Sequence, residues 1–166
     1  KEIPVIAAGG IYDGGDIYEI MDAGANGVKM GTRFVTTHEC DVSDAFKQNY
    51  INAREGDVTI LDSPVGLPAR VLANDFVREI QMGKQKPVNC PWKCLKTCNY
   101  KEVQFCIAEV LFNAAQGDFA HGFSFAGTTA ARADKITSVK ETFDQLLEEY
   151  AEFSKAHVRP VAVLKP

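Results

Sequence analysis

The stretch that decides the fold is Ile3-Pro-Val-Ile-Ala-Ala-Gly-Gly-Ile11, close to the start of the chain. Residues 3–8 are a short, continuous apolar run, which is typical of a strand buried on both faces of a parallel sheet. The pair Gly9-Gly10 ends the run. A helix is predicted next, with Asp16 near its start, and residues 27–31 resemble a second short strand. Strand, glycine loop, helix and strand together predict one right-handed βαβ unit.

Further elements follow from hydrophobic spacing and turn residues. The expected order is a helix at 43–53, a strand at 57–62, a rigid turn at 63–68, a helix at 69–82, a linker at 83–91 and a helix at 102–116. Ser138 and Glu141 form a capping-box pair that opens a last helix. Its predicted inner face consists of Val139, Phe143, Leu146, Leu147, Tyr150 and Phe153.

Composition excludes several classes of protein. The chain has 166 residues, of which 46% are hydrophobic and 24% charged, so we expect a folded rather than a disordered protein. A net charge of −4 without a Lys/Arg block argues against nucleic acid or an anionic membrane as a partner. No apolar run approaches a bilayer span, and no signal peptide is recognisable. We therefore expect a cytoplasmic protein and, since the chain lacks an initiator Met, a piece of a longer one.

Two glycine clusters are the sharpest candidates for a binding site. Ala8-Gly9-Gly10-Ile11 and Lys29-Met30-Gly31-Thr32 each stand at the C-terminal end of a predicted strand. Without a Cβ atom, glycine lets backbone N–H groups approach an anion, and the following helix N-terminus adds a favourable dipole. In (β/α)₈ barrels, the loops after strands seven and eight commonly hold a phosphate. The spacing of the two clusters favours a phosphate site over two ordinary tight turns.

The ordered series of motifs resembles the nitronate monooxygenase (2-nitropropane dioxygenase) family, which is similar in turn to the FMN-dependent enoyl-ACP reductases. The resemblance covers nearly the whole chain and is more specific than any single motif. The motifs that carry it are Ile3–Ile11, Ala23-Gly-Ala-Asn-Gly-Val28, Met30-Gly-Thr-Arg-Phe34, Ser63-Pro-Val-Gly-Leu-Pro-Ala-Arg70, Cys90-Pro-Trp-Lys-Cys-Leu-Lys-Thr-Cys98 and Phe125-Ala-Gly-Thr-Thr-Ala-Ala-Arg-Ala-Asp-Lys135.

The resemblance implies an α/β fold: the last two βα units of a TIM barrel, followed by a mainly helical extension. Residues 1–40 would form the barrel units, 41–136 an appended helical segment with the cysteine run, and 137–166 the last helix and tail. FMN would be held non-covalently, with its phosphate on residues that match the family by position. These residues are Gly9, Gly10, Lys29, Met30, Gly31 and Thr32.

The implied reaction is oxidation of an alkyl nitronate by O2 to a carbonyl compound and nitrite. One alternative is FMN-dependent reduction of an enoyl thioester with NAD(P)H. A second is a nucleotide-binding barrel similar to inosine monophosphate dehydrogenase, because Gly15-Asp16-Ile17 fits the helix start of that group. A third is a non-catalytic fragment or interaction module, which would need a homo-oligomer or the N-terminal barrel half to cover its bare faces.

The resemblance also shows what is missing. A (β/α)₈ barrel needs eight strands and about 250 residues. The family's catalytic histidine lies in a Gly-Gly-His segment upstream of residue 1, so no catalytic residue is assigned here and the chain alone should be inactive. His38, His121 and His157 are interpreted as solvated histidines rather than as its replacement.

Four of the five cysteines fall within seventeen residues: Cys90, Cys94, Cys98 and Cys106. On a helix, the first three would lie one turn apart on one face. Thiolates at short spacing can bind zinc or an iron–sulfur cluster, but this spacing is neither a zinc-ribbon nor a ferredoxin pattern. The favoured interpretation is a set of small, buried thiols in a reduced setting, with no metal.

Few other polar residues attract a functional interpretation. Arg33 could reach an anion, although a surface ion pair is the favoured reading. Arg70 and Arg132 lie in segments that the resemblance places near the flavin. Ser63 lacks a histidine or an acid at an informative spacing, and the Thr128-Thr129 loop is taken as an ordinary turn. Trp92 is expected in the core.

Overall fold

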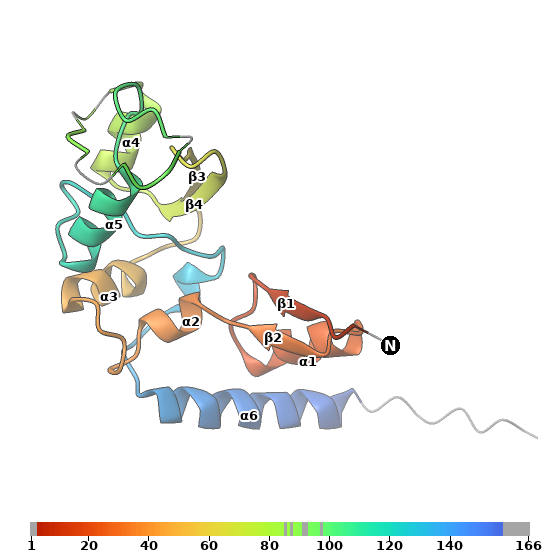
Figure 1. Ribbon diagram of the computed structural model, residues 1–166. Helices are drawn as coiled ribbons and strands as arrows, with labels where there is room; N and C mark the ends of the chain where they lie inside the picture. Colours follow the sequence, from red (N-terminus) through yellow and green to blue (C-terminus); the bar gives the residue numbers. More distant parts are fainter. Residues whose placement is uncertain (1–2, 85, 87, 91–92, 97, 158–166) are drawn as a thin grey trace, which may run out of the picture.

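A computed structural model shows a chain with two regions (Figure 1). The first, here called the βαβ region, comprises residues 3–40 together with the helix at the C-terminal end. The second, the hairpin region, comprises the middle of the chain between residues 41 and 136. The structure describes residues 3–84, 86, 88–90, 93–96 and 98–157.

The predicted βαβ unit is confirmed. Strand β1 (Ile6–Ala8) pairs in parallel with β2 (Gly27–Lys29), and helix α1 (Gly14–Asp22) joins them. Asp13 and Asp16 form a capping box at the start of α1, so each carboxylate accepts a hydrogen bond from the other residue's backbone N–H. Gly24, at φ +108°, follows the end of the helix, in a conformation that strains residues with a Cβ atom.

The expectation that the first strand is buried on both faces is wrong for this structure. The Ile6 side chain is 57% exposed, and Ile3 and Val5 are exposed as well. The physical reason is that the sheet holds only β1 and β2 among the described residues, so few side chains cover it. Ile11 and Tyr12, just beyond β1, are buried.

Helix α6 (Val139–Ala156) packs along α1 (Figure 1). Its capping box, Ser138 with Glu141, is confirmed. The two helices approach closely because Gly14 and Gly15 lie in the interface, where a Cβ atom on Gly14 would stand 2.2 Å from the backbone nitrogen of Tyr150. The predicted inner face of this helix is only half correct. Leu146 is buried, whereas Phe143 and Leu147 remain 52% and 66% exposed.

The hairpin region contains a self-contained aromatic core. Strand β3 (Val58–Asp62) pairs antiparallel with β4 (Pro68–Leu72), and helices α4 (Asp75–Gln81) and α5 (Ile107–Ala115) pack beside them. The core residues are Leu61, Ala69, Val71, Phe76, Val77, Ile80, Phe105, Val110 and Phe123. The segment 41–136 therefore contains a β-hairpin as well as helices.

The prediction of one helix over 69–82 is wrong in its first half. Residues 68–72 form a strand because the tight turn before them brings the chain back along β3, and alternate side chains such as Ala69 and Val71 then enter the core. The helix begins only at Asp75, where the Asn74 side chain accepts a hydrogen bond from Val77 N–H. Likewise, the helix expected at 102–116 begins at Ile107 rather than at Glu102.

The remaining elements connect the two regions. Helix α2 (Thr32–Val35) directly follows β2, and α3 (Asp44–Ile51) begins at a Ser43 cap, close to the predicted helix at 43–53. A 3₁₀ turn, η1 (Ala130–Arg132), packs near α3. None of the helices within the described ranges is both long and apolar enough to cross a membrane. Trp92, expected in the core, lies outside the described residues.

Candidate functional site

The two glycine clusters meet at one edge of the sheet. Ala8 and Lys29 are the last paired residues of β1 and β2, and the strands are parallel. The turns that follow, Gly9-Gly10 and Met30-Gly31, therefore leave the sheet side by side. The structure thus brings together the residues that the sequence placed at a phosphate site.

The backbone at these turns is open. Gly9 and Gly10 adopt φ values of +88° and +75°, a region that other residues enter at a cost of about 1–2 kcal/mol. A Cβ atom on Gly9, Gly10 or Gly31 would meet no heavy atom within 4 Å. Outside the helices and strands, no described hydrogen bond uses the backbone N–H of these three glycines. Among the described residues, no bond of a turn, loop or cap therefore occupies these three donors.

A third segment contacts these turns. The backbone N–H of Gly127 donates to Thr32 Oγ1 at 3.0 Å, which joins the loop at 125–129 to the start of α2. The same loop is held to the hairpin by Ala126 N–H, which donates to the carbonyl of Arg70 at 3.0 Å. The segments containing Arg70 and Thr128 thus approach the glycine turns. Sequence reasoning had grouped them only through the family resemblance.

The N-terminus of α1 is surrounded by carboxylates, whereas the sequence predicted that its dipole would favour a bound anion. Two of its first N–H groups are already used, because Asp16 N–H donates to Asp13 at 2.9 Å and Gly14 N–H donates to Glu149 of α6 at 2.8 Å. Three carboxylates therefore lie against this helix end. Any anion at the glycine turns would have to depend on the turns themselves rather than on the dipole of α1.

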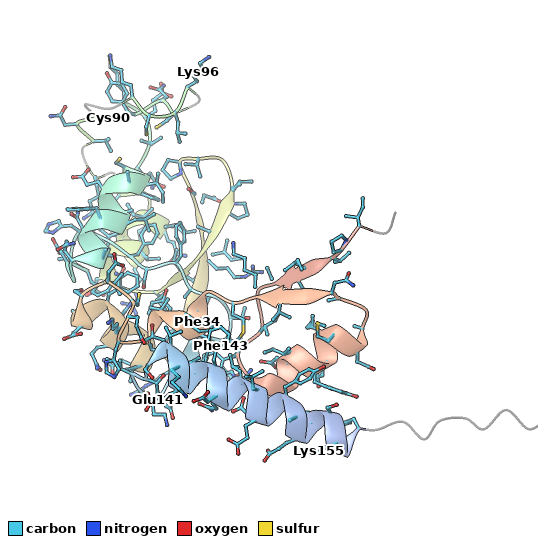
Figure 2. All side chains as sticks on the ribbon, turned by 60° about the horizontal axis from the view of Figure 1, so that its bottom comes forward. Phe34, Cys90, Lys96, Glu141, Phe143 and Lys155 are labelled. Atoms are coloured by element: carbon cyan, nitrogen blue, oxygen red, sulfur yellow. The ribbon has the colours of Figure 1, made fainter. Side chains whose placement is uncertain are left out.

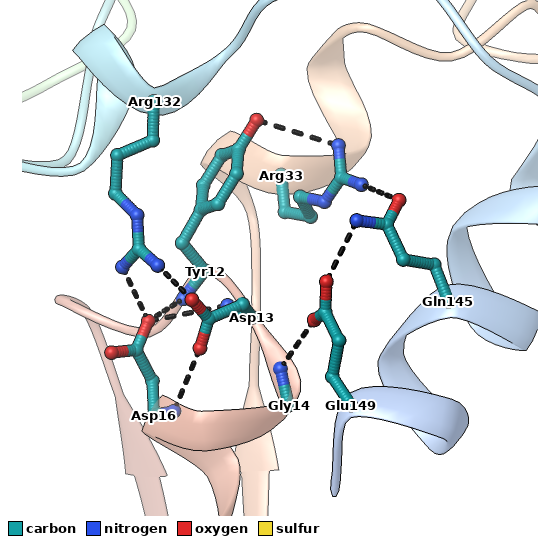
Figure 3. Close-up of polar contacts among 8 residues, drawn as sticks. All are labelled: Tyr12, Asp13, Gly14, Asp16, Arg33, Arg132, Gln145 and Glu149. Atoms are coloured by element: carbon teal, nitrogen blue, oxygen red, sulfur yellow. Dashed lines mark hydrogen bonds and ion pairs between the residues drawn. The ribbon is translucent and has the colours of Figure 1, made fainter. Parts of the chain in front are cut away.

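Tyr12 lies between two guanidinium groups (Figure 3). The Cζ atoms of Arg33 and Arg132 stand 4.8 and 5.0 Å from the centre of its ring, which is cation–π geometry. Arg132 forms ion pairs with Asp13 and with Asp16, the latter at 2.6 Å. Five residues from three segments are thus assembled immediately after the Gly9-Gly10 turn.

The sequence favoured a surface ion pair for Arg33, and the structure contradicts this prediction. Its side chain is only 4% exposed, and it donates to Gln145 Oε1 at 3.0 Å and to the Tyr12 hydroxyl at 3.4 Å. Gln145 in turn donates to Glu149 at 2.7 Å, so the nearest carboxylate on this path is one residue removed. The buried position arises because α6 covers α2 at this point.

Titration behaviour reflects these contacts. Burial acts to raise the pKa of Asp16, but hydrogen bonds from the N–H groups of Tyr12 and Asp13 and from Arg132 outweigh it, and the pKa falls below its usual range. Burial raises the pKa of Tyr12, an effect that the positive charge of Arg33 partly offsets. The carboxylate and the neutral phenol are therefore the stable forms at neutral pH.

The three histidines lie away from the glycine turns. His38 is exposed, and its N–H donates to the carbonyl of Thr137. His121 is exposed and its Nδ1 lies 2.8 Å from Asp118. His157 ends α6 and stacks on Phe153. These positions agree with the interpretation of solvated histidines.

The cysteine run lies at the far end of the hairpin region from the glycine turns, as Cys90 shows relative to Phe34 in Figure 2. Around it the described residues form turns rather than a helix. Cys94 is exposed and the other thiols are half-buried, so the expectation of fully buried thiols is wrong. Within the described residues, no three side chains of Cys, His, Asp or Glu are arranged to hold a metal ion.

An apolar groove of about 560 Å³ runs between α1, β2 and α6. Residues of β2 and the exposed side chains of Phe143 and Leu147 are among those that line it. Exposed apolar surface of this kind is rare on a protein without a partner. Among the described residues of the βαβ region, exposed apolar side chains thus lie both at this groove and on β1.

Sequence reasoning missed Tyr12 and Asp13 as parts of the site. Both lie immediately after the quoted glycine motif, which ends at Ile11, and the spacing of Asp13 and Asp16 was a usable signal for a capping box. The contact of Tyr12 with Arg132 joins residues far apart in the chain, and no local pattern announces it.

Comparison with known proteins agrees with the resemblance. The sequence model of the nitronate monooxygenase family matches residues 1–149. A Rhodococcus jostii protein named (3aS,4S,5R,7aS)-5-hydroxy-7a-methyl-1-oxo-octahydro-1H-indene-4-carboxyl-CoA dehydrogenase is 42% identical over 80 residues, covering 48% of this chain and 23% of the relative. A Staphylococcus saprophyticus protein named "Probable nitronate monooxygenase" is 40% identical over 78 residues, covering 47% and 22%.

Solved structures show the same relation. FabK from Thermotoga maritima superposes with a TM-score of 0.77 at 32% identity, covering 94% of this chain and 47% of FabK. Nitroalkane oxidase from Streptomyces ansochromogenes superposes with a TM-score of 0.69 at 24% identity, which supports the fold alone, and covers 94% and 42%. The chain thus spans about half of these structures, and the matched part is about a quarter of the relatives above. Since the family match covers most of its length, the chain belongs to the nitronate monooxygenase family.

Proposed function

We propose that this chain carries the FMN-phosphate site of a flavin-dependent oxidoreductase that oxidises alkyl nitronates with O2. The observation that carries the proposal is the juxtaposition of the Gly9-Gly10 and Gly31-Thr32 turns at the ends of two paired parallel strands. Family membership supports the flavin over the nucleotide of an inosine-monophosphate-dehydrogenase-like barrel. Similarity to FabK supports the view that these strands belong to a larger barrel.

The residues present fit a phosphate group. The turns offer unpaired backbone N–H groups and open space where a Cβ atom would stand, which is the cradle that an approaching anion needs. Lys29, exposed at the end of β2, would add a positive charge. The Thr32 hydroxyl would have to donate to the phosphate while its oxygen accepts from Gly127, which a hydroxyl can do.

Bound FMN would supply the redox chemistry, and the chain would supply binding and orientation. Gly9, Gly10, Gly31 and Thr32 would fix the phosphate, with Met30 at the border of the apolar groove. The loop at 125–129 would shield the bound end of the cofactor from water, because its Gly127 is tied to Thr32. No proton-transfer group is assigned in this chain, and the histidine implied by the resemblance would come from upstream.

The open face of the βαβ region supports a requirement for more protein. Strands β1 and β2 pair only with each other among the described residues, and the groove beside them is apolar. We infer that an N-terminal barrel half covers this face, in the same polypeptide or as a separate partner. A homo-oligomer remains the alternative cover, and the chain alone is expected to be catalytically inactive.

The phosphate site is tested by titrating FMN into the ¹⁵N-labelled chain and following backbone amides by NMR. The expected result is a set of shifts at Gly9, Gly10, Gly31 and Thr32 that riboflavin, which lacks the phosphate, does not produce. Gly10→Ala should weaken the FMN effect, whereas Gly24→Ala, which carries similar φ strain away from the site, should not. Equal shifts with riboflavin, or shifts confined to other residues, would refute the phosphate site.

A second candidate is reduction of an enoyl thioester with NAD(P)H. The similarity to FabK and to a dehydrogenase named for a carboxyl-CoA compound favours it. In the whole flavin-loaded enzyme, propionate 3-nitronate with O2 should give nitrite if the first proposal holds. Oxidation of NADH that depends on an enoyl thioester, without nitrite formation, would replace the nitronate reaction by the thioester reaction.

A further inference from the structure

The proposed phosphate site has an unfavourable neighbour. Asp13 and Asp16 lie shortly after the Gly9-Gly10 turn, and both carboxylates accept hydrogen bonds in the capping box of α1. Two carboxylates close to a phosphate dianion would repel it. Two unit charges in contact near a protein surface interact by about 1–4 kcal/mol. A site that binds phosphate here needs a compensating positive charge.

Arg132 provides such a charge in the right place. Its guanidinium pairs with both carboxylates through different nitrogen atoms, Nη1 to Asp16 at 2.6 Å and Nη2 to Asp13. These groups are only partly exposed, so water screens them less than it screens ordinary surface pairs. The pairing places a positive charge on both carboxylates of the cap.

Arg33 adds a positive charge of another kind. It is buried, and its hydrogen bonds among the described residues go to Tyr12 and Gln145, so no carboxylate contacts it directly. It follows Thr32 in the sequence, and its guanidinium lies against the Tyr12 ring. Asp134 and Glu149 are the further acids that face this cluster, one acting on Tyr12 and the other through Gln145.

We propose that Arg132, seated on the Tyr12 ring opposite Arg33, is a positioning residue that fixes the Gly9-Gly10 turn and neutralises the acidic cap of α1, so that the turn accepts a phosphate dianion. The inference rests on the proposed function and names residues of that site beyond the glycine turns. Tyr12 is the common support, because its backbone N–H is bound by Asp16 and its ring contacts both arginines.

The charge part of this proposal is tested by the ratio of the dissociation constants for riboflavin and FMN, measured with the complete 166-residue chain. In Arg132→Met this ratio should fall about fivefold to tenfold, as expected for one uncompensated charge at intermediate dielectric. Riboflavin binding should stay unchanged. Asp16→Asn added to Arg132→Met should restore most of the ratio, because it removes the charge that Arg132 had cancelled.

The positioning part needs no ligand. Heteronuclear ¹H–¹⁵N NOE values of Gly9 and Gly10 should fall in Arg132→Met and Tyr12→Leu but stay high in Arg132→Lys, which retains the charge. The values of Gly24, in the turn after α1, serve as the internal reference. A variant that weakens riboflavin and FMN equally, or leaves both the ratio and the NOE values unchanged, overturns the inference.

The two proposals fail in different ways. If the wild-type chain does not prefer FMN to riboflavin, the phosphate site itself is refuted and the charge part falls with it. The NOE values then still decide whether Arg132 holds the turn. If the wild-type chain prefers FMN and Arg132→Met retains the full preference, the function stands and only the role of Arg132 is refuted.

Discussion

The hairpin region and the βαβ region differ in how far their apolar side chains are buried. The hairpin region surrounds Phe123 with Phe76 and Phe105 and leaves these rings almost no exposed area. The βαβ region contains the proposed site, yet Ile6 and Leu147 lie open to solvent. One region completes its own core, and the other presents its apolar surface outward.

This difference indicates which interactions stabilise each region. In the hairpin region, stability comes from apolar area removed from water, which is the dominant favourable term in folding. In the βαβ region, much of the order near the site comes from polar contacts, such as the ion pairs of Arg132 and the bond from Gly14 to Glu149. Substitutions in the two regions should therefore differ in size and in their dependence on pH.

The largest effect is expected from Phe123→Ala. The Phe123 side chain is fully buried and its ring contacts Phe76 and Phe105 in the core, so its loss should lower the free energy of unfolding by about 3–5 kcal/mol. Urea unfolding followed by circular dichroism measures the change. Phe112→Ala, on the exposed side of α5, is the matched control and should cost little. A similar cost for both would mean that the aromatic core is not what stabilises this region.

The next effect concerns the junction between α1 and α6. A Cβ atom on Gly14 would overlap the backbone of Tyr150, so Gly14→Ala should separate the helices at a cost of about 1–3 kcal/mol. Gly31→Ala is the control, because its position is open and its φ of −109° suits alanine. Thermal unfolding of both variants provides the measurement. If Gly14→Ala is as stable as Gly31→Ala, the close approach of the helices is not important for stability.

Local patterns predicted the elements whose signals lie close together in the chain. The βαβ unit followed from an apolar run, a glycine pair and helical spacing, and the cap at Ser138 from its partner three residues later. The prediction of a helix included residues 69–72 because apolar and polar positions over a few residues fit both periods. Only pairing with β3, a contact across the turn, decides that they form a strand.

For the site, too, the sequence predicted only the residues whose signal is local in the chain. Gly9 and Gly10 stand out because few residues tolerate their positive φ, and Gly31 stands out by its position just after the second strand. The arginines could not be placed, because the burial of Arg33 depends on the distant helix α6, and Arg132 meets Asp16 across the fold. The dipole argument for α1 failed for the same reason, since Glu149 of α6 occupies the helix end.

A smaller effect, dependent on pH, is expected from Asp16→Asn. The pKa of Asp16 is lowered from 3.8, since the backbone N–H groups of Tyr12 and Asp13 and the charge of Arg132 together outweigh the opposing effect of burial. A lowered pKa means that the stabilisation is fully present above about pH 4 and is lost as the pH falls through the folded-state value. The variant should therefore be less stable than the wild type at pH 7 and equal to it in strong acid.

Unfolding by urea at a series of pH values measures this difference. Asp144→Asn is the control, because Asp144 pairs only with the exposed Lys140, and a surface pair of this kind contributes about 0–1 kcal/mol. A gap between Asp16→Asn and the wild type that stays constant from pH 7 to pH 2 would show that charge plays no part in it.

The smallest effect on stability is expected from Leu147→Ser. The Leu147 side chain is 66% exposed at the rim of the groove, so little apolar area returns to water when it is removed, and the free energy of unfolding should change by less than about 0.5 kcal/mol. The same substitution should reduce self-association, measured by analytical ultracentrifugation, because it interrupts the exposed apolar face. Leu146→Ser, one residue earlier but buried, should instead unfold the helix contact. If Leu147→Ser destabilises the chain as strongly as Leu146→Ser, the groove is already covered in solution, and the contrast between an open and a closed region disappears.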